Sequence, residues 1–117
     1  MDFDSHENIK IRYYSDNWGP FSFDLTDAIP SGSTLTSVSV KAYLGKVRPA
    51  DDLSSETEIT SSVIDADYTP QIIDSVKVSV KFKYSATYKD QKATIIFEVT
   101  TSTGAKHPIY FHSVDVE

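Results

Sequence analysis

The chain has 117 residues, of which 39% are hydrophobic and 12% aromatic, enough for one domain with its own core. It contains no cysteine, which excludes disulfide bonds, cysteine-ligated zinc, iron–sulfur clusters and thiol catalysis. Its formal net charge of −6 disfavours nucleic acid as a partner, because that charge repels phosphate. No apolar run approaches the roughly 20 residues that span a bilayer, and the acidic start of the chain does not resemble a secretion signal. The sequence therefore predicts a protein without a membrane partner.

The first predicted elements are two short strands joined by a turn. Residues 1–8 are polar and are expected to form an arm. Apolar and polar residues alternate over 9–13 and again over 21–25, which is typical of strands buried on one face. The segment between them is rich in turn-forming residues and contains Trp18, which we expect to cap one end of the core.

A long strand and a long acidic loop follow. Residues 35–44 alternate, with an offset that predicts a bulge near 36–37. Residues 46–58 show no regular alternation of apolar and polar residues. They are expected to form an extended loop, or to contain one short helical turn at 50–53. Residues 59–64 resemble a short strand. Because loops between strands often carry binding contacts, the 46–58 loop is a candidate contact segment.

The second half of the chain has the strongest strand signals. Residues 72–84 alternate most clearly and predict a single long strand. Residues 92–116 predict a closing hairpin with a four-residue turn at 101–104, where Gly104 supplies tolerance of positive φ. The alternation changes phase near 112–113, which predicts a second bulge.

These elements predict an all-β fold. An antiparallel two-sheet immunoglobulin-like β-sandwich of about seven strands fits the spacing of strands and turns, with residues 9–117 as a single domain. A closed barrel with a similar number of strands is the alternative architecture.

The charges are separated along the sequence. Between residues 51 and 74 there are seven acids and no Lys or Arg, whereas the next segment carries five lysines and one acid. Two interpretations remain open: two solvated surfaces, or complementary charges between neighbouring copies or partner proteins. The acids are Asp51, Asp52, Glu56, Glu58, Asp65, Asp67 and Asp74, and the lysines are Lys77, Lys81, Lys83, Lys89 and Lys92.

The sequence contains no catalytic or metal-binding motif. His107 and His112 lie five residues apart on one predicted strand, so only a bulge would bring them to one face. Asp65 and Asp67 lack the glycine and the downstream glutamate of a calcium loop. No serine has the sequence context of an activated nucleophile. We therefore expect a non-enzymatic protein with no cofactor and no metal.

Several segments resemble the small immunoglobulin-like structural proteins of tailed bacteriophages, including tail-fibre adaptor and neck-type proteins. The segments are Trp18 with 21–25, Ile-Pro-Ser-Gly-Ser-Thr-Leu at 29–35 leading into Val-Ser-Val at 38–40, Ile-Phe-Glu-Val-Thr-Thr-Ser-Thr-Gly at 96–104, and the terminal strand over 109–116. The resemblance implies a virion protein made in the bacterial host cytoplasm, without catalytic residues. It also implies assembly, as a homo-oligomer or in a ring, with other phage structural proteins of the neck, head-tail connector or tail adaptor.

The candidate contact residues are charged or apolar side chains in the loops and on the basic segment. They are Trp18, Arg48, Asp51, Asp52, Leu53, Lys77, Lys81 and Lys83. The alternative function is a carbohydrate-binding or adhesin-type module that stacks sugars on Trp18 and exposed tyrosines. A host-side surface domain is a third possibility.

Overall fold

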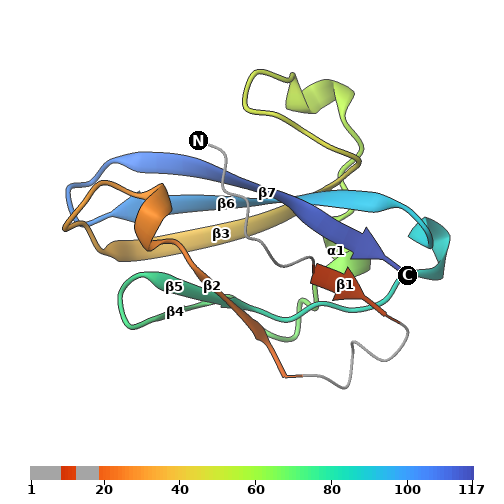
Figure 1. Cartoon of the computed structure of the whole chain (residues 1–117), viewed down its shortest axis with the longest axis horizontal. Helices are drawn as coiled ribbons and strands as arrows, with labels where there is room; N and C mark the ends of the chain where they lie inside the picture. Colours follow the sequence, from red (N-terminus) through yellow and green to blue (C-terminus); the bar gives the residue numbers. More distant parts are fainter. Residues whose placement is uncertain (1–8, 13–18) are drawn as a thin grey trace.

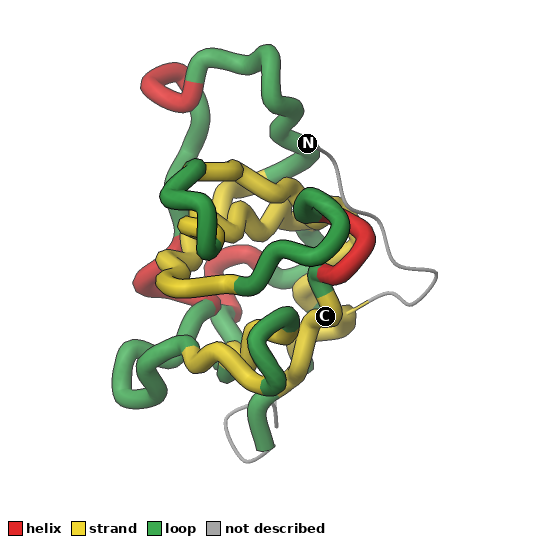
Figure 2. The backbone as a smooth tube through the Cα atoms, turned by 90° about the vertical axis from the view of Figure 1, so that its left-hand side faces the viewer, coloured by secondary structure: helices red, strands yellow, loops and turns green. Residues whose placement is uncertain are grey.

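The computed structural model describes residues 9–12 and 19–117, which form two β-sheets packed face to face (Figure 1 and Figure 2). The strands are β1 (Ile9–Ile11), β2 (Phe21–Asp24), β3 (Leu35–Leu44), β4 (Gln71–Ile73), β5 (Lys77–Val80), β6 (Lys92–Thr101) and β7 (Lys106–Val116). Within the described ranges, the short helical turns between the strands are η2 (Thr26–Ala28), η3 (Leu53–Ser55), α1 (Thr60–Val63) and η4 (Ala86–Tyr88).

One sheet has the strand order β1-β7-β6-β3 and the other the order β2-β5-β4. The structure confirms the predicted all-β, two-sheet architecture. It differs from the prediction at one strand pair, because β1 runs parallel to β7 whereas all other pairs within the two sheets are antiparallel.

The core lies between the sheets and is formed by the alternating apolar residues of both inner faces. Phe23 of β2 is at its centre, with its ring centroid 4.9 Å from that of Phe97 and 5.3 Å from that of Phe111. A third ring, Phe82, lies 6.2 Å from Phe23 in an edge-on arrangement. Such tilted and edge-on contacts are the favoured geometry of aromatic pairs.

The predicted strand at 35–44, the predicted closing hairpin at 92–116 and both predicted bulges are confirmed. The pairing of β3 with β6 shifts between Leu35 and Ser37. The pairing of β6 with β7 shifts between Ala93 and Ile95, so that residues 112–113 both lie opposite Thr94. The turn of this hairpin places Gly104 at φ +84°, where glycine has no steric penalty.

Two strand predictions were wrong. Residues 72–84 form a hairpin, β4–β5, followed by an isolated bridge between Phe82 and Ile64. The chain reverses at Asp74 and Ser75, which have φ values of 52° and 67°. The predicted strand at 59–64 contains α1, because the buried Ile59 and Val63 are four residues apart and a helical turn brings both to the core.

The last described residues are joined to the first strand. The backbone N–H of Glu117 donates to the carbonyl of Ile11 at 2.9 Å. The Glu117 carboxylate accepts a hydrogen bond from Arg12 Nε at 2.9 Å and lies 3.4 Å from Lys10 Nζ. These ion pairs extend the parallel β1–β7 contact beyond its three paired residues.

Candidate interaction surfaces

The acidic loop, residues 46–58, is fixed at its base by Thr94, a fully buried residue of β6. The Thr94 hydroxyl accepts a hydrogen bond from the Val47 N–H at 2.9 Å and donates one to the Gly45 carbonyl at 2.8 Å. The loop lies outside the two sheets (Figure 1). Its entry from β3 is therefore set by a side chain of the neighbouring strand.

Leu53 fixes the middle of the acidic loop. It packs against a small second cluster on the outer face of the four-stranded sheet, formed by Tyr43, Val47, Ile96 and Tyr110. Leu53 was predicted as an intermolecular contact residue, and the structure places it, half-buried, in an intramolecular contact. The acidic loop is thus held to the sheet by apolar packing as well as by hydrogen bonds.

The tip of the acidic loop carries the exposed charges. The Arg48 N–H donates to Asp51 Oδ2 at 2.7 Å, and the Asp51 N–H donates back to the Arg48 carbonyl at 3.0 Å. Asp52 caps η3 by accepting from the Ser54 hydroxyl at 2.8 Å and the Ser54 N–H at 3.0 Å. Both hydrogen bonds lower the pKa of Asp52 below its usual value, and the bond from the Ser54 hydroxyl has the larger effect. The Asp52 carboxylate at the tip is therefore ionised at neutral pH.

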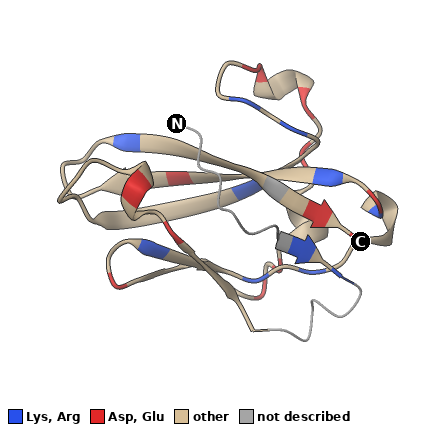
Figure 3. Cartoon of the chain, in the orientation of Figure 1, with Lys and Arg blue, Asp and Glu red and all other residues tan. Residues whose placement is uncertain are grey.

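The predicted basic residues belong to the other layer of the molecule (Figure 3). Lys77 lies in β5, whereas Lys81 and Lys83 follow it, and all three are partly exposed. Lys81 is already paired within the chain, with its Nζ 3.7 Å from Asp65 Oδ2. Thus Lys77 and Lys83 are the better candidates for an intermolecular contact. Trp18, the remaining candidate, lies outside the described residues.

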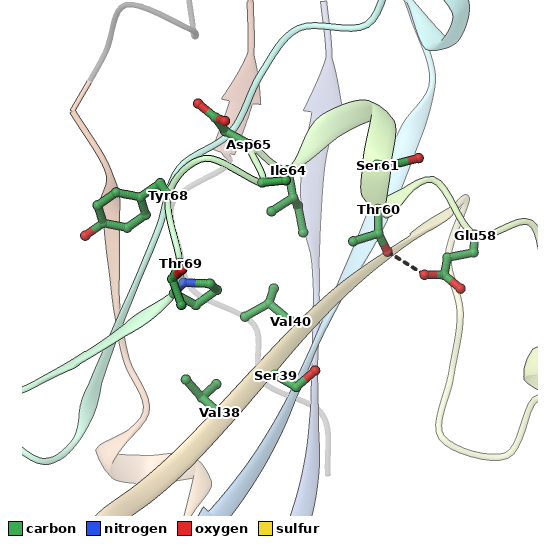
Figure 4. Close-up of a pocket in the computed structure, with 12 residues that line it drawn as sticks. Val38, Ser39, Val40, Glu58, Thr60, Ser61, Ile64, Asp65, Tyr68 and Thr69 are labelled. Carbon is green, nitrogen blue, oxygen red and sulfur yellow. Dashed lines mark hydrogen bonds between the residues drawn. The ribbon is translucent and has the colours of Figure 1, made fainter.

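A cavity of about 710 Å³ opens along β3, the outer strand of its sheet (Figure 4). Val38 and Val40 line it from β3, and Ile64 and Pro70 line it from the segment that passes beside the strand. In Figure 4 the side chains of Val38, Val40 and Ile64 point into the open space, whereas Asp65 points away. The cavity is therefore an apolar opening in the side of the sandwich.

Sequence reasoning missed Thr94, Val38 and Val40. Alternation identifies Val38 and Val40 as inward-facing residues of a strand, but nothing in the sequence indicates that this strand lies at the edge of its sheet. Thr94 occupies a position on the outer face of β6, and its contact with residue 47 spans a sequence separation without any local signal.

His107 and His112, the histidines within the described residues, do not converge on a metal site. His107 is opposite Val99 on the inner side of β7, whereas His112 Nδ1 lies 3.4 Å from the hydroxyl of Thr94 on the outer side. Within residues 9–12 and 19–117, no group of three or more His, Cys, Asp or Glu side chains could hold a metal ion. None of the helices in the same described ranges is long and apolar enough to cross a membrane.

Comparison with known proteins gave no relative on which to base an assignment. No family model, no curated protein and no solved structure matches this chain.

Proposed function

We propose that this chain is a non-enzymatic structural protein that joins copies of itself or other structural proteins, as in the neck, head-tail connector or tail adaptor of a tailed bacteriophage virion. The supporting observation is the acidic loop, residues 46–58, which is anchored by Thr94 and Leu53 and presents exposed charges at its tip. The immunoglobulin-like arrangement of about seven strands is part of this proposal.

The anchoring of the acidic loop favours association. A loop that is already ordered loses little conformational entropy when a partner binds, so more of the contact energy appears as affinity. The carboxylates of Asp51 and Asp52 complement the ammonium groups of Lys77 and Lys83. The loop packs on the four-stranded sheet, whereas Lys77 belongs to the three-stranded one. A contact between them in two copies is therefore head-to-tail, the geometry that closes into rings.

Sedimentation velocity at low and high salt tests the head-to-tail contact. A D51N/D52N variant removes two charges but keeps side-chain oxygens that can still cap the turn. We expect it to weaken self-association by about two- to tenfold at low salt, with a smaller difference at high salt. A K77Q/K83Q variant should have a similar effect, and combining the two pairs should add little because both remove the same contact.

The matched control is D27N/D67N, which removes the same number of carboxylates from exposed positions outside the acidic loop. It should leave self-association unchanged. A chain that stays monomeric at every concentration and at low salt would contradict the head-to-tail contact.

Mass spectrometry of purified particles from the producing host tests the virion assignment. The protein should be recovered with the particles in a fixed ratio to their other structural proteins. Its absence from intact particles would contradict the assignment to a virion.

A further inference from the structure

The backbone of β3 is open on the side that faces away from β6. The Ala42 carbonyl accepts from the Ile59 N–H at 2.8 Å, and the Leu44 N–H donates to the Thr57 carbonyl at 2.9 Å. Even-numbered residues of β3 therefore direct their backbone groups away from β6, and the same parity applies to Val38 and Val40. In the described part of the chain, no hydrogen bond reaches the N–H or C=O groups of these two valines on that side.

The stretch of β3 without hydrogen-bond partners on this side is bounded at both ends by segments that are hydrogen-bonded to the strand. At the start of β3, the Leu35 N–H donates to the Ser75 carbonyl at 2.7 Å. At the other end, residues 57–60 lie along the strand, joined to it by the bridge between Tyr43 and Glu58. The gap between them, residues 36–41, is about 20 Å long at the rise of a β-strand. This length matches one extended segment of five or six residues.

The cavity beside β3 selects the inward side chains of such a segment. A strand paired with Val38 and Val40 would direct alternate side chains between the two sheets, as β3 itself does. There they would meet Val38, Val40, Ile64 and Pro70, which line the cavity. The segment should therefore carry apolar residues at every second position.

The carboxylate of Glu58 determines which side chains the partner segment should carry on its outward face. It is opposite Tyr43, an outer-face residue, and its exposed carboxylate accepts a hydrogen bond from the Thr60 hydroxyl at 2.9 Å (Figure 4). A segment that continues the line of residues 57–59 would place its outward side chains on the same side as this carboxylate. The residues that line the cavity include no Lys or Arg, and of its two acids Asp65 is paired with Lys81 whereas Glu58 is exposed. Lys41, the one cation within residues 36–41, is paired across the sheet with Glu98, its Nζ 3.6 Å from Oε1. A lysine or arginine on the partner would complement the charge of Glu58.

We propose that the β3 edge, residues 36–41, is a strand-addition site for an extended segment of a partner protein with alternating apolar and basic residues. Backbone hydrogen bonds to Val38 and Val40 supply affinity, and the cavity and Glu58 supply selectivity. The occupant is a single segment, because a second copy of β3 would bring its own residues 57–60 and 64–70 into the same narrow gap. This site shares only Glu58 with the acidic loop and does not depend on the role proposed for the tip of that loop at Asp51 and Asp52.

Isothermal titration and amide NMR test the proposal with three synthetic hexapeptides. The first alternates valine and lysine, the second replaces lysine with glutamate, and the third carries N-methyl groups on the residues that would pair with β3. We expect the first to bind and to protect the Val38 and Val40 amide protons from exchange. The third should bind about tenfold or more weakly, because it cannot form two of the hydrogen bonds. The second should also bind more weakly than the first.

Three variants of the whole chain complete the experiment. Val38→Pro removes an outward N–H without removing a bond to β6, so the fold should persist while affinity falls about three- to tenfold. Glu58→Gln should lower the affinity for the lysine peptide by about two- to fivefold. The control Asp90→Asn, at an exposed position away from this edge, should leave that affinity unchanged.

Three results would overturn the proposal: no binding of the lysine peptide at about 1 mM, equal binding of the N-methylated peptide, or protection of amides away from β3. A concentration-dependent dimer that forms without peptide and is lost in Val38→Pro would instead assign this edge to a second copy.

Discussion

Thr94 and Val47 are joined by a buried hydrogen bond of 2.9 Å, although 47 residues separate them in sequence. The same hydroxyl donates to the Gly45 carbonyl, so one side chain satisfies the two backbone groups at which β3 passes into the acidic loop. Val47 is fully buried and Gly45 half-buried, so water has little access to replace the hydroxyl at the Val47 N–H. The orientation of the loop therefore depends on a residue that belongs to another strand.

Replacing Thr94 by valine should destabilise the protein by about 1–3 kcal/mol, since it keeps the shape but leaves a buried donor and acceptor unsatisfied. Urea unfolding measures the change. Thr94→Ser keeps the hydroxyl and should lose only about 0.8 kcal/mol for the missing methyl group. Equal midpoints for the valine variant and the wild type would show that the hydroxyl does not anchor the loop.

Replacing Phe23 by alanine should cost about 3–5 kcal/mol, because it opens a cavity between three aromatic rings in the centre of the core. The comparison is Ile73→Ala, at a side chain of which 38% is exposed, which should change the free energy of unfolding by less than about 0.5 kcal/mol. Chemical denaturation of both variants checks the prediction. A Phe23 variant as mild as the Ile73 variant would contradict this core packing.

Replacing Gly104 by alanine should cost about 1–2 kcal/mol through backbone strain alone. A Cβ atom at this position meets no heavy atom within 4 Å, so the penalty comes from the φ of +84° and not from a clash. Gly19 has the same free space for a Cβ atom but no positive φ, and Gly19→Ala should be close to neutral. Thermal unfolding distinguishes the two, and equal melting temperatures would contradict the prediction.

Acid should weaken the contact between β1 and β7. The hydrogen bond from Arg12, and then that from Lys10, hold the pKa of Glu117 below its ordinary value of 4.5. The folded state therefore binds this proton less tightly than the unfolded chain does. The stabilisation is complete above pH 4.5 and is lost as the pH falls through the lowered pKa.

Stability measured between about pH 7 and pH 2 should therefore fall less steeply in Glu117→Gln than in the wild type. Hydrogen exchange should also be faster at the Glu117 amide of the variant, because that N–H donates to Ile11 across the β1–β7 contact. Superimposable pH profiles would show that the carboxylate makes no contribution. Asp24 and Asp52, whose pKa values are lowered mainly by the hydroxyls of Thr26 and Ser54, should add to the acid sensitivity of both proteins.

The long strands could be predicted from the sequence because their alternation is uninterrupted. β3, β6 and β7 each run for ten or eleven residues, and the phase changes at their bulges are visible in the order of apolar residues. The β4–β5 hairpin could not be predicted, because Asp74 and Ser75 adopt positive φ without a glycine to mark the turn. Alternation over 72–84 assigns Ser79 to the same polar face as Lys77 and Lys81, yet Ser79 is buried and its hydroxyl lies 2.9 Å from that of Tyr68.

The interaction surfaces were less accessible to sequence reasoning. The acidic loop was located by its lack of a period and by its charge. Its contact residues were not all distinguishable, since Leu53 packs on Ile96 and Tyr110, two apolar residues of an outer face that alternation assigns to solvent. The open edge of β3 follows from the order of strands in the sheet, which no short sequence pattern encodes.

The parallel pairing of β1 with β7 determines how the domain would respond to tension. Ile9 is opposite Val114 and Ile11 is opposite Val116, so both strands run in the same direction. A force that pulls the chain before Ile9 and the chain after Val116 in opposite directions slides one strand along the other. All the hydrogen bonds between these strands then bear the load together instead of opening one by one. This pair of strands should therefore resist extension from its two ends more strongly than a pair whose hydrogen bonds open one at a time.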